Sequence, residues 1–337
     1  MRINAYLSYI WGSFIAILFF TSCVGGNQQY KAEGVAWNTQ YHISYSASKP
    51  LNDSIQPILR KVELSLSPFC PNSLISRINK GEDAEVDSML AEVFETSKQV
   101  NEWSNGMFDP TVSPVINLWG FGYKNYGKAP TQSQIDSALY YVGIDSCFII
   151  NNRIKKKHPS TEFNFSAITK GYGCDLIGKM LQRNGCNDFM IEIGGDMLIA
   201  GKNPQGKPWR VMIDAPIDND TSITHSKVAV IEITDCGIAT SGNYRNFKKN
   251  VEGRKIGHTI NPQTGQPVAT STLSATVIAP NAMMADALAT ACMAMPHHEA
   301  LKMIESIPST SAMLITAAST SGKWEIITSS HFPKIIK

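Results

Sequence analysis

The segment 163–196 constrains the fold of this chain more than any other part of it. A small polar run precedes Lys170 and Gly171, and apolar residues then recur at helical spacing, which predicts an amphipathic helix. Free backbone N–H groups at such a helix start favour an anion, for example a phosphate. A strand is expected over 189–193, followed by a Gly-Gly turn where backbone can approach a ligand. An ordinary helix and hairpin with a surface lysine is the alternative, because both features are common.

Elsewhere the patterns of strands and helices interleave without a strict β-α-β rhythm, which predicts a mixed α+β architecture rather than a doubly wound sheet. Helices are expected over 55–66, 90–104, 132–142, 281–295 and 298–307, strands over 35–45, 209–213, 228–234 and 273–278, and loops over 237–247 and 257–268. With 337 residues, 43% of them hydrophobic, the chain can build one large domain or two lobes.

The charge balance and the missing motifs narrow the function classes. Thirty basic and 28 acidic residues give a formal charge of +2 without a dense basic block. Neither nucleic acid nor an anionic membrane is therefore indicated as an electrostatic partner. The chain has no G-x-x-x-x-G-K-[ST], G-x-G-x-x-G, H-E-x-x-H or G-x-S-x-G motif. A negative ligand would have to be held by a local site.

The N-terminus has the pattern of a targeting segment. Arg2 precedes an apolar run over 10–20 that is too short to span a bilayer, and small residues then lead to Cys23. This pattern resembles a bacterial lipoprotein signal, in which 1–22 would be the signal peptide and Cys23 the lipidated first residue. Residues 23–31 would form a tether and 32–337 the folded domain. The expected location is the cell envelope, lipid-anchored on the periplasmic side of a bacterial membrane; a plain secretory signal or an uncleaved anchor is the alternative.

Asp286 and Thr290 are candidates for a metal site. They lie four residues apart in an apolar helical pattern, so both oxygens emerge from one helix face. Mg²⁺ commonly takes one or two carboxylates and completes its octahedron with water and substrate phosphate. The alternative is an acidic residue answering the helix dipole and a threonine bonded to a backbone carbonyl.

His258 is a candidate general base. It precedes Asn261 and Pro262 in a turn-forming loop, where backbone can hold an imidazole that stays accessible. A structural histidine is the alternative.

Seven motifs, in order, resemble the ApbE family of FAD:protein FMN transferases. They are SPFCPNSLISRIN, GMFDPTVSPVINLWGFG, NFSAITKGYGCD, IEIGGD, GIATSGNYRN, GHTINPQTGQPV and MADALATA, and the resemblance covers roughly residues 32–330. It implies an exported, often lipid-anchored protein with a mixed α+β fold and FAD in a cleft between two lobes. The implied reaction moves the FMN half of FAD onto a Thr or Ser hydroxyl of a target protein, requires Mg²⁺ and releases AMP.

The resemblance also assigns site residues. The implied metal ligands are Asp286, Thr290 and the backbone oxygen of Ala167, and His258 matches the histidine of the motif H-x-[IL]-[DN]-P-x-T-G. The implied flavin nucleotide contacts are Met107, Phe108, Asp109, Asn164, Lys170 and Ile260, with Trp37 and Phe69 as aromatic or apolar walls. The chain departs from the family at Asn164, where many members have Asp, at Ser166-Ala167, where a Gly pair or similar small residues are commoner, and at Gly257, where a second histidine is frequent.

These residues fit attack of a hydroxyl on a pyrophosphate. Mg²⁺ and Lys170 would neutralise the phosphates, and His258, or an Asp of an adjacent loop, would take the proton. By resemblance, the acceptor is an exported protein, for example a subunit of a sodium-pumping or Rnf-type redox complex. Two alternatives remain open: a Mg²⁺-dependent FAD pyrophosphatase that releases FMN and AMP, and a non-catalytic flavin-binding lipoprotein.

Overall fold

The computed structural model describes residues 27–124, 129–216, 227–242, 247–249, 255–318 and 323–336. The expected signal peptide 1–22, Cys23 and the first residues of the tether lie outside these ranges. Within them, no helix has the length and apolar character needed to cross a bilayer.

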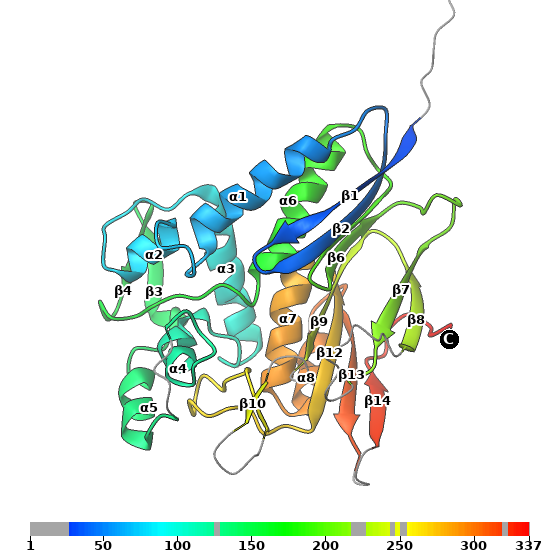
Figure 1. The fold of residues 1–337 in the computed structure, drawn as a ribbon. Helices are drawn as coiled ribbons and strands as arrows, with labels where there is room; N and C mark the ends of the chain where they lie inside the picture. The colour runs from blue at the N-terminus through cyan, green and yellow to red at the C-terminus, as the bar shows by residue number, and fades with distance from the viewer. Residues whose placement is uncertain are drawn as a thin grey trace, which may run out of the picture.

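An eight-stranded antiparallel sheet forms the centre of the fold (Figure 1). Its strands, in spatial order, are β1 (Gln28–Ala36), β2 (Thr39–Ala47), β5 (Phe189–Ile193), β6 (Asp196–Ala200), β9 (Cys236–Gly242), β12 (Thr272–Ala279), β13 (Ser311–Ala317) and β14 (Trp324–Thr328). Together with the helices this confirms the predicted mixture of α and β structure.

Three helices lie against one face of the sheet: α1 (Ile55–Leu66), α6 (Thr169–Arg183) and α7 (Ala282–Ala294) (Figure 1). Ile177 and Leu181 of α6 pack in one buried cluster with Ile191 of β5. Helices α3 (Ser88–Trp103) and α8 (His297–Ser306) pack on α7, which is apolar on nearly every side. Such an all-round apolar helix is expected only where neighbours cover it completely.

The opposite face of the sheet carries the small two-stranded sheet of β7 (Trp209–Asp214) and β8 (Lys227–Ile233). Their alternating apolar residues, among them Val211 and Ile231, pack on Ile199 and Ile238 of the central sheet. The segment between β2 and α6 contains the remaining short elements: α2 (Leu74–Asn79), α4 (Ser113–Leu118), α5 (Gln132–Leu139), β3 (Cys147–Ile150), β4 (Arg153–Lys156) and the 3-10 turns 52–54, 110–112 and 144–146. The pair β10 (Phe247–Lys249) and β11 (Lys255–Gly257) completes the fold.

The structure corrects the expected single strand over 35–45. Two strands, β1 and β2, meet there in a hairpin whose two-residue turn is Trp37-Asn38, with φ of 50° and 62°. Positive φ at both positions is typical of a type I′ turn, for which Asn is a favoured residue but Trp is unusual. Residues 28–31, which were expected to be part of a tether, belong to β1.

The segment 237–247 was expected as a loop, but its first part lies in β9, an inner strand between β6 and β12. Its small residues have a packing reason. A Cβ on Gly237 would lie 2.2 Å from the carbonyl carbon of Asn281, so only glycine lets α7 begin this close to the sheet. Sequence reasoning missed β9 because its small residues have a low β propensity, and those residues are there because α7 packs against the strand.

Candidate active site

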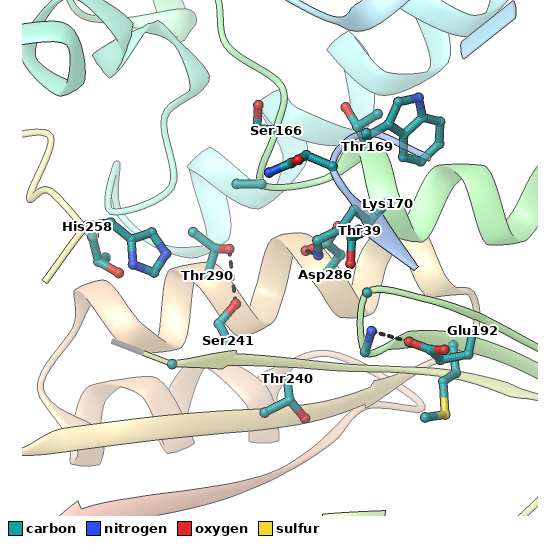
Figure 2. Close-up of a pocket in the computed structure, with 18 of the residues that line it drawn as sticks. Thr39, Ser166, Thr169, Lys170, Glu192, Thr240, Ser241, His258, Asp286 and Thr290 are labelled. Atoms are coloured by element: carbon teal, nitrogen blue, oxygen red, sulfur yellow. Dashed lines mark hydrogen bonds and ion pairs between the residues drawn. The ribbon is translucent and has the colours of Figure 1, made fainter. Parts of the chain in front are cut away.

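One cavity of about 1360 Å³ contains every site residue that the sequence indicated, apart from the lipidation cysteine. Its walls include Trp37, Phe69, Met107, Phe108, Asp109, Asn164, Ala167, Lys170, His258, Ile260, Asp286 and Thr290. These residues come from segments more than two hundred positions apart, and Figure 2 shows several of them around the same space. Their convergence is a property of the fold, whereas the role of each remains a prediction.

Lys170 lies between two buried carboxyl groups. Its Nζ forms an ion pair with Asp196 Oδ2 and lies 3.7 Å from Asp286 Oδ1. Burial alone would lower the pKa of Lys170, but the two carboxylates hold it above its usual value. Burial and the neighbouring Asp286 raise the pKa of Asp196. Two carboxyl groups thus face a single ammonium, an arrangement that favours additional positive charge.

The surroundings of Asp286 fit a hard divalent cation. Its Oδ2 accepts a hydrogen bond from the Gly171 N–H at 3.1 Å, while Oδ1 already faces a cationic group. Thr290 lies one turn further along α7, and Ala167 borders the same cavity. A carboxylate, a hydroxyl and a carbonyl are oxygen donors of the kind Mg²⁺ prefers. Within the described ranges no three His, Cys, Asp or Glu side chains are grouped to hold a metal, so such an ion would depend on water and phosphate as further ligands.

Helix α7 is held in position by α6. The Asp175 carboxylate accepts hydrogen bonds from the N–H groups of Ala282 and Met283, at 2.8 and 2.9 Å, and Asn281 caps the same end by accepting from Met284 N–H. Burial raises the pKa of Asp175 to about 7. These contacts satisfy backbone donors at the start of α7 and fix the helix that presents Asp286.

Gly171 sets how closely α6 and α7 approach. A Cβ there would lie 2.1 Å from the Ala282 carbonyl oxygen, a backbone atom that cannot rotate away. We expect Gly171→Ala to lower the free energy of unfolding by about 1–3 kcal/mol, the usual cost of overpacking. Denaturant unfolding measures it, and Gln182→Ala on the exposed side of α6 is the control, expected within about 0.5 kcal/mol of wild type. Equal stability of both variants would contradict this account.

Aromatic and apolar residues form the other walls. The Trp37 indole packs on α6 at Gly173, where a Cβ would lie 2.6 Å from the ring. The Phe69 ring is 58% exposed and meets Tyr123 edge-on, with 6.1 Å between the ring centroids. Flat rings of this kind can cover a planar ligand.

Asp109 has a structural function that the sequence did not reveal. Its Oδ1 accepts hydrogen bonds from the N–H and the hydroxyl of Thr111, and its Oδ2 accepts from Ile144 N–H at 3.1 Å. Burial raises the pKa of Asp109. Protein donors therefore already bind both oxygens of this carboxylate.

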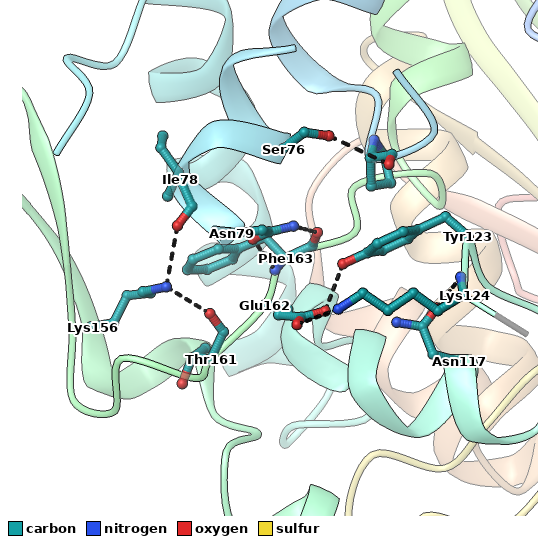
Figure 3. A network of polar contacts seen from close by, with 11 residues as sticks. Ser76, Ile78, Asn79, Asn117, Tyr123, Lys124, Lys156, Thr161, Glu162 and Phe163 are labelled. Carbon is teal, nitrogen blue, oxygen red and sulfur yellow. Dashed lines mark hydrogen bonds and ion pairs between the residues drawn. The ribbon is translucent and has the colours of Figure 1, made fainter. Parts of the chain in front are cut away.

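A polar network holds the segment that leads to the start of α6 (Figure 3). The Asn79 side chain pairs with both backbone groups of Phe163 at 2.8 Å, and Glu162 accepts from Tyr123 and Lys124. Asn164, which follows Phe163, accepts a hydrogen bond at its Oδ1 from Ser166 N–H at 3.0 Å. This network fixes Asn164 and Ala167 beside the cavity.

His258 lies half-buried at the end of the cavity nearer Thr290, while Lys170 and Asp286 lie further along (Figure 2). Its ring meets Phe121 edge-on, with 6.4 Å between the centroids. The following loop is closed by a hydrogen bond from Gly265 N–H to the Asn261 carbonyl. A defined turn therefore follows the histidine closely in the chain, and the role of its imidazole stays a prediction.

Three residues of the site were missed by sequence reasoning. Asp196 pairs with Lys170, Asp175 caps α7, and the Ser241 hydroxyl lies 3.3 Å from that of Thr290. A signal existed for Asp175, which follows Gly171 by one helical turn, and for Asp196, which directly follows the Gly-Gly turn. Only the fold shows that these side chains meet Lys170, Thr290 and the start of α7.

Comparison with known proteins finds a family match. Residues 37–315 match the model of the ApbE family. The chain is 32% identical over 305 residues to a protein of Haemophilus influenzae called FAD:protein FMN transferase, covering 86% of this chain and 87% of the relative, and 31% identical over 310 residues to one of that name from Escherichia coli K12, covering 86% and 87%.

Solved structures of ApbE flavin transferases have the same fold as this chain. The flavin transferase ApbE of Vibrio cholerae superimposes with a TM-score of 0.78 at 30% identity, over 90% of this chain and 98% of the other. The apo form of the Pseudomonas stutzeri flavinyl transferase ApbE gives 0.80 at 27% identity, over 91% and 96%.

Proposed function

This chain belongs to the ApbE family and is an FAD:protein FMN transferase, and we propose that it uses Mg²⁺ to move FMN from FAD to a Thr or Ser hydroxyl of a protein. The observation that carries the proposal is the placement of Lys170, Asp286 and Thr290 in the cavity that also contains the aromatic walls and His258.

In the proposed reaction the hydroxyl oxygen of the acceptor forms a bond to the phosphorus of the FMN half. The bond between that phosphorus and the bridging oxygen breaks, AMP leaves with the bridging oxygen, and the hydroxyl proton passes to a base. Lys170 stabilises negative charge on the phosphates, since its ammonium is fixed by two carboxylates. Held by Asp286, Thr290 and the Ala167 carbonyl, Mg²⁺ would supply charge neutralisation on the pyrophosphate. His258 is the proposed base.

Hydrolysis of FAD to FMN and AMP is the second candidate. It needs the same charge neutralisation, with water in place of the protein hydroxyl. Lys170 and Asp286 both line the cavity, which either nucleophile would have to enter. A non-catalytic flavin carrier would instead require Asp286 and Thr290 to be purely structural.

The transfer activity can be tested in cells. The chain is expressed together with the exported proteins of its own bacterium, and denatured proteins are separated and examined for covalent flavin fluorescence. We expect a fluorescent band that requires both the enzyme and a Thr or Ser in the labelled protein. Free FMN without any labelled protein would favour the hydrolase. Membrane redox subunits of the sodium-pumping or Rnf type are the first acceptors to examine.

We also propose that the protein is anchored through Cys23 at the periplasmic side of the membrane. The support is the short apolar run followed by small residues and a cysteine. Cys23→Ala should abolish incorporation of a labelled fatty acid and release the protein from washed membranes, because stable anchoring requires the acyl chains. Thr21→Ser, which keeps a small residue before the cysteine, serves as the control. Unchanged lipid labelling of Cys23→Ala would refute the anchor.

A further inference from the structure

The cavity is larger than most small-molecule sites. Small-molecule pockets usually measure about 300–1,000 Å³, whereas this cavity measures about 1360 Å³. Beyond Gly194 and Gly195 the cavity continues over the face of the central sheet opposite to α1, α6 and α7. There it is bordered by Lys31, Glu33, His42, Ser44, Met190 and Glu192. This extension is called the sheet groove below. It contains none of the twelve residues assigned to FAD, metal or base.

Strand β7 borders the sheet groove with its edge. Five consecutive residues of β7, from Arg210 to Asp214, line the cavity. Successive side chains of a strand point to opposite faces, and here they alternate between exposed and buried. An unbroken run of five can line one cavity only if the strand turns its edge, and hence its backbone, toward it.

The hydrogen-bond register shows which backbone groups lie on that edge. Val230 of β8 accepts from Ile336 N–H at 2.8 Å on the side away from β7, so its backbone groups point away from β7. Val230 is opposite Met212. The two therefore form a non-hydrogen-bonded pair of the antiparallel ladder, and the N–H and C=O of Met212 point into the sheet groove. No strand among the described residues pairs with β7 on this side.

An unpaired edge with a row of backbone donors and acceptors is a template for another strand. Transfer to a protein hydroxyl requires a polypeptide to enter the same cavity as the nucleotide. The sheet groove is continuous with the space around Lys170 and Asp286. We propose that the edge of β7 binds the acceptor polypeptide as an added strand, which leads the reacting hydroxyl toward Lys170 and Asp286. This inference rests on the proposed transferase function.

A peptide scan tests the proposal directly. Peptides spanning the labelled hydroxyl of an exported protein that the enzyme flavinylates are made with one N-methylated amide at a time. Because the amides of a strand alternate in direction, N-methylation should impair transfer at every second position. Each impaired peptide should show a KM raised by about 3- to 10-fold, the worth of one backbone hydrogen bond. A uniform response along the peptide would overturn strand addition.

Two proline variants give a second test. Met212→Pro removes a donor from the free edge without removing a bond to β8, and should raise the KM for the whole acceptor protein by about 3- to 10-fold. Val230→Pro on the outer edge of β8 is the matched control, expected to leave that KM unchanged. FAD affinity should be unchanged in both, which also shows that the cavity is folded. Equal KM values for Met212→Pro and wild type would contradict the proposal. If Met212→Pro fails to fold, the peptide scan with the wild-type enzyme tests strand addition instead.

The outcomes separate the two proposals. If the wild-type enzyme labels no protein, the transferase function falls and strand addition falls with it. If labelling occurs without a two-residue period in the scan, only strand addition is refuted. The edge of β7 would then be expected to bind a second copy or another segment of this chain.

Discussion

Asp286→Asn is expected to lower FMN transfer by about 100-fold or more at a fixed Mg²⁺ concentration and to raise the Mg²⁺ concentration needed for half-maximal activity. The change removes the one charged ligand of the proposed site, and metal stabilisation of transferring phosphates is worth several kcal/mol, at about 1.4 kcal/mol for each tenfold in rate. The fold should survive, because an amide oxygen can still accept from Gly171 N–H and Lys170 keeps its ion pair with Asp196.

Transfer rates across a Mg²⁺ titration, with circular dichroism as the folding control, measure the effect. Thr290 provides a matched pair in the same site: Thr290→Ser keeps the hydroxyl and should remain near wild type, whereas Thr290→Val removes it and should shift the titration in the same direction as Asp286→Asn. If Asp286→Asn leaves both the rate and the Mg²⁺ dependence unchanged, the carboxylate serves only to bind Gly171 and Lys170.

His258→Ala is expected to slow FMN transfer by about 10²- to 10⁴-fold, the usual worth of a general base, with little change in FAD affinity. Raising the pH should partly rescue the variant, because a more strongly ionised acceptor or hydroxide replaces the missing base. His331→Ala provides the control, since that histidine is exposed and does not border the cavity. Single-turnover transfer at saturating FAD and Mg²⁺, measured across pH, gives the comparison.

A structural histidine gives a different pair of results. His258 packs against Phe121 in a defined turn, so a purely structural role predicts loss of thermal stability or FAD binding. Its remaining activity would then follow the wild-type pH profile. Superimposable profiles would remove His258 from the catalytic residues and leave positioning by Lys170 and the metal as the main source of rate.

Local patterns in the sequence were sufficient for most of the helices. The periodic segment 55–66 coincides with α1, and the predicted helix start at Lys170 lies one residue from the start of α6 at Thr169. Both helices bury one amphipathic stripe, so local pattern and tertiary packing agree. The apolar run over 281–295 likewise became α7 because its cap, Asn281, is local in the chain.

The secondary-structure predictions were wrong where packing between distant segments determines the local structure. β9 contains glycine and small polar residues because α7 begins directly against it, and no local pattern reveals a neighbour more than forty residues away. The hairpin turn at Trp37-Asn38 requires positive φ at a tryptophan, which propensity disfavours and packing on Gly173 compensates.

The same reason explains what was missed in the site. Motif resemblance located Lys170 and Asp286, but their shared partner Asp196 and the cap supplied by Asp175 depend on how α6, β6 and α7 meet. Asp109 borders the cavity, and its carboxylate also accepts hydrogen bonds from Thr111 and Ile144, which the sequence did not reveal. Sequence therefore indicated the residues of the cavity better than it indicated their partners.

One measurement tests the transferase account most directly. Purified enzyme, FAD, Mg²⁺ and an exported acceptor protein are incubated, and the intact mass of the acceptor is followed together with released AMP. The account predicts that the acceptor gains one FMN moiety for each AMP released, and that replacing the labelled Thr or Ser by Ala abolishes both. Release of AMP and free FMN with an unchanged acceptor mass, or recovery of intact FAD, would contradict it.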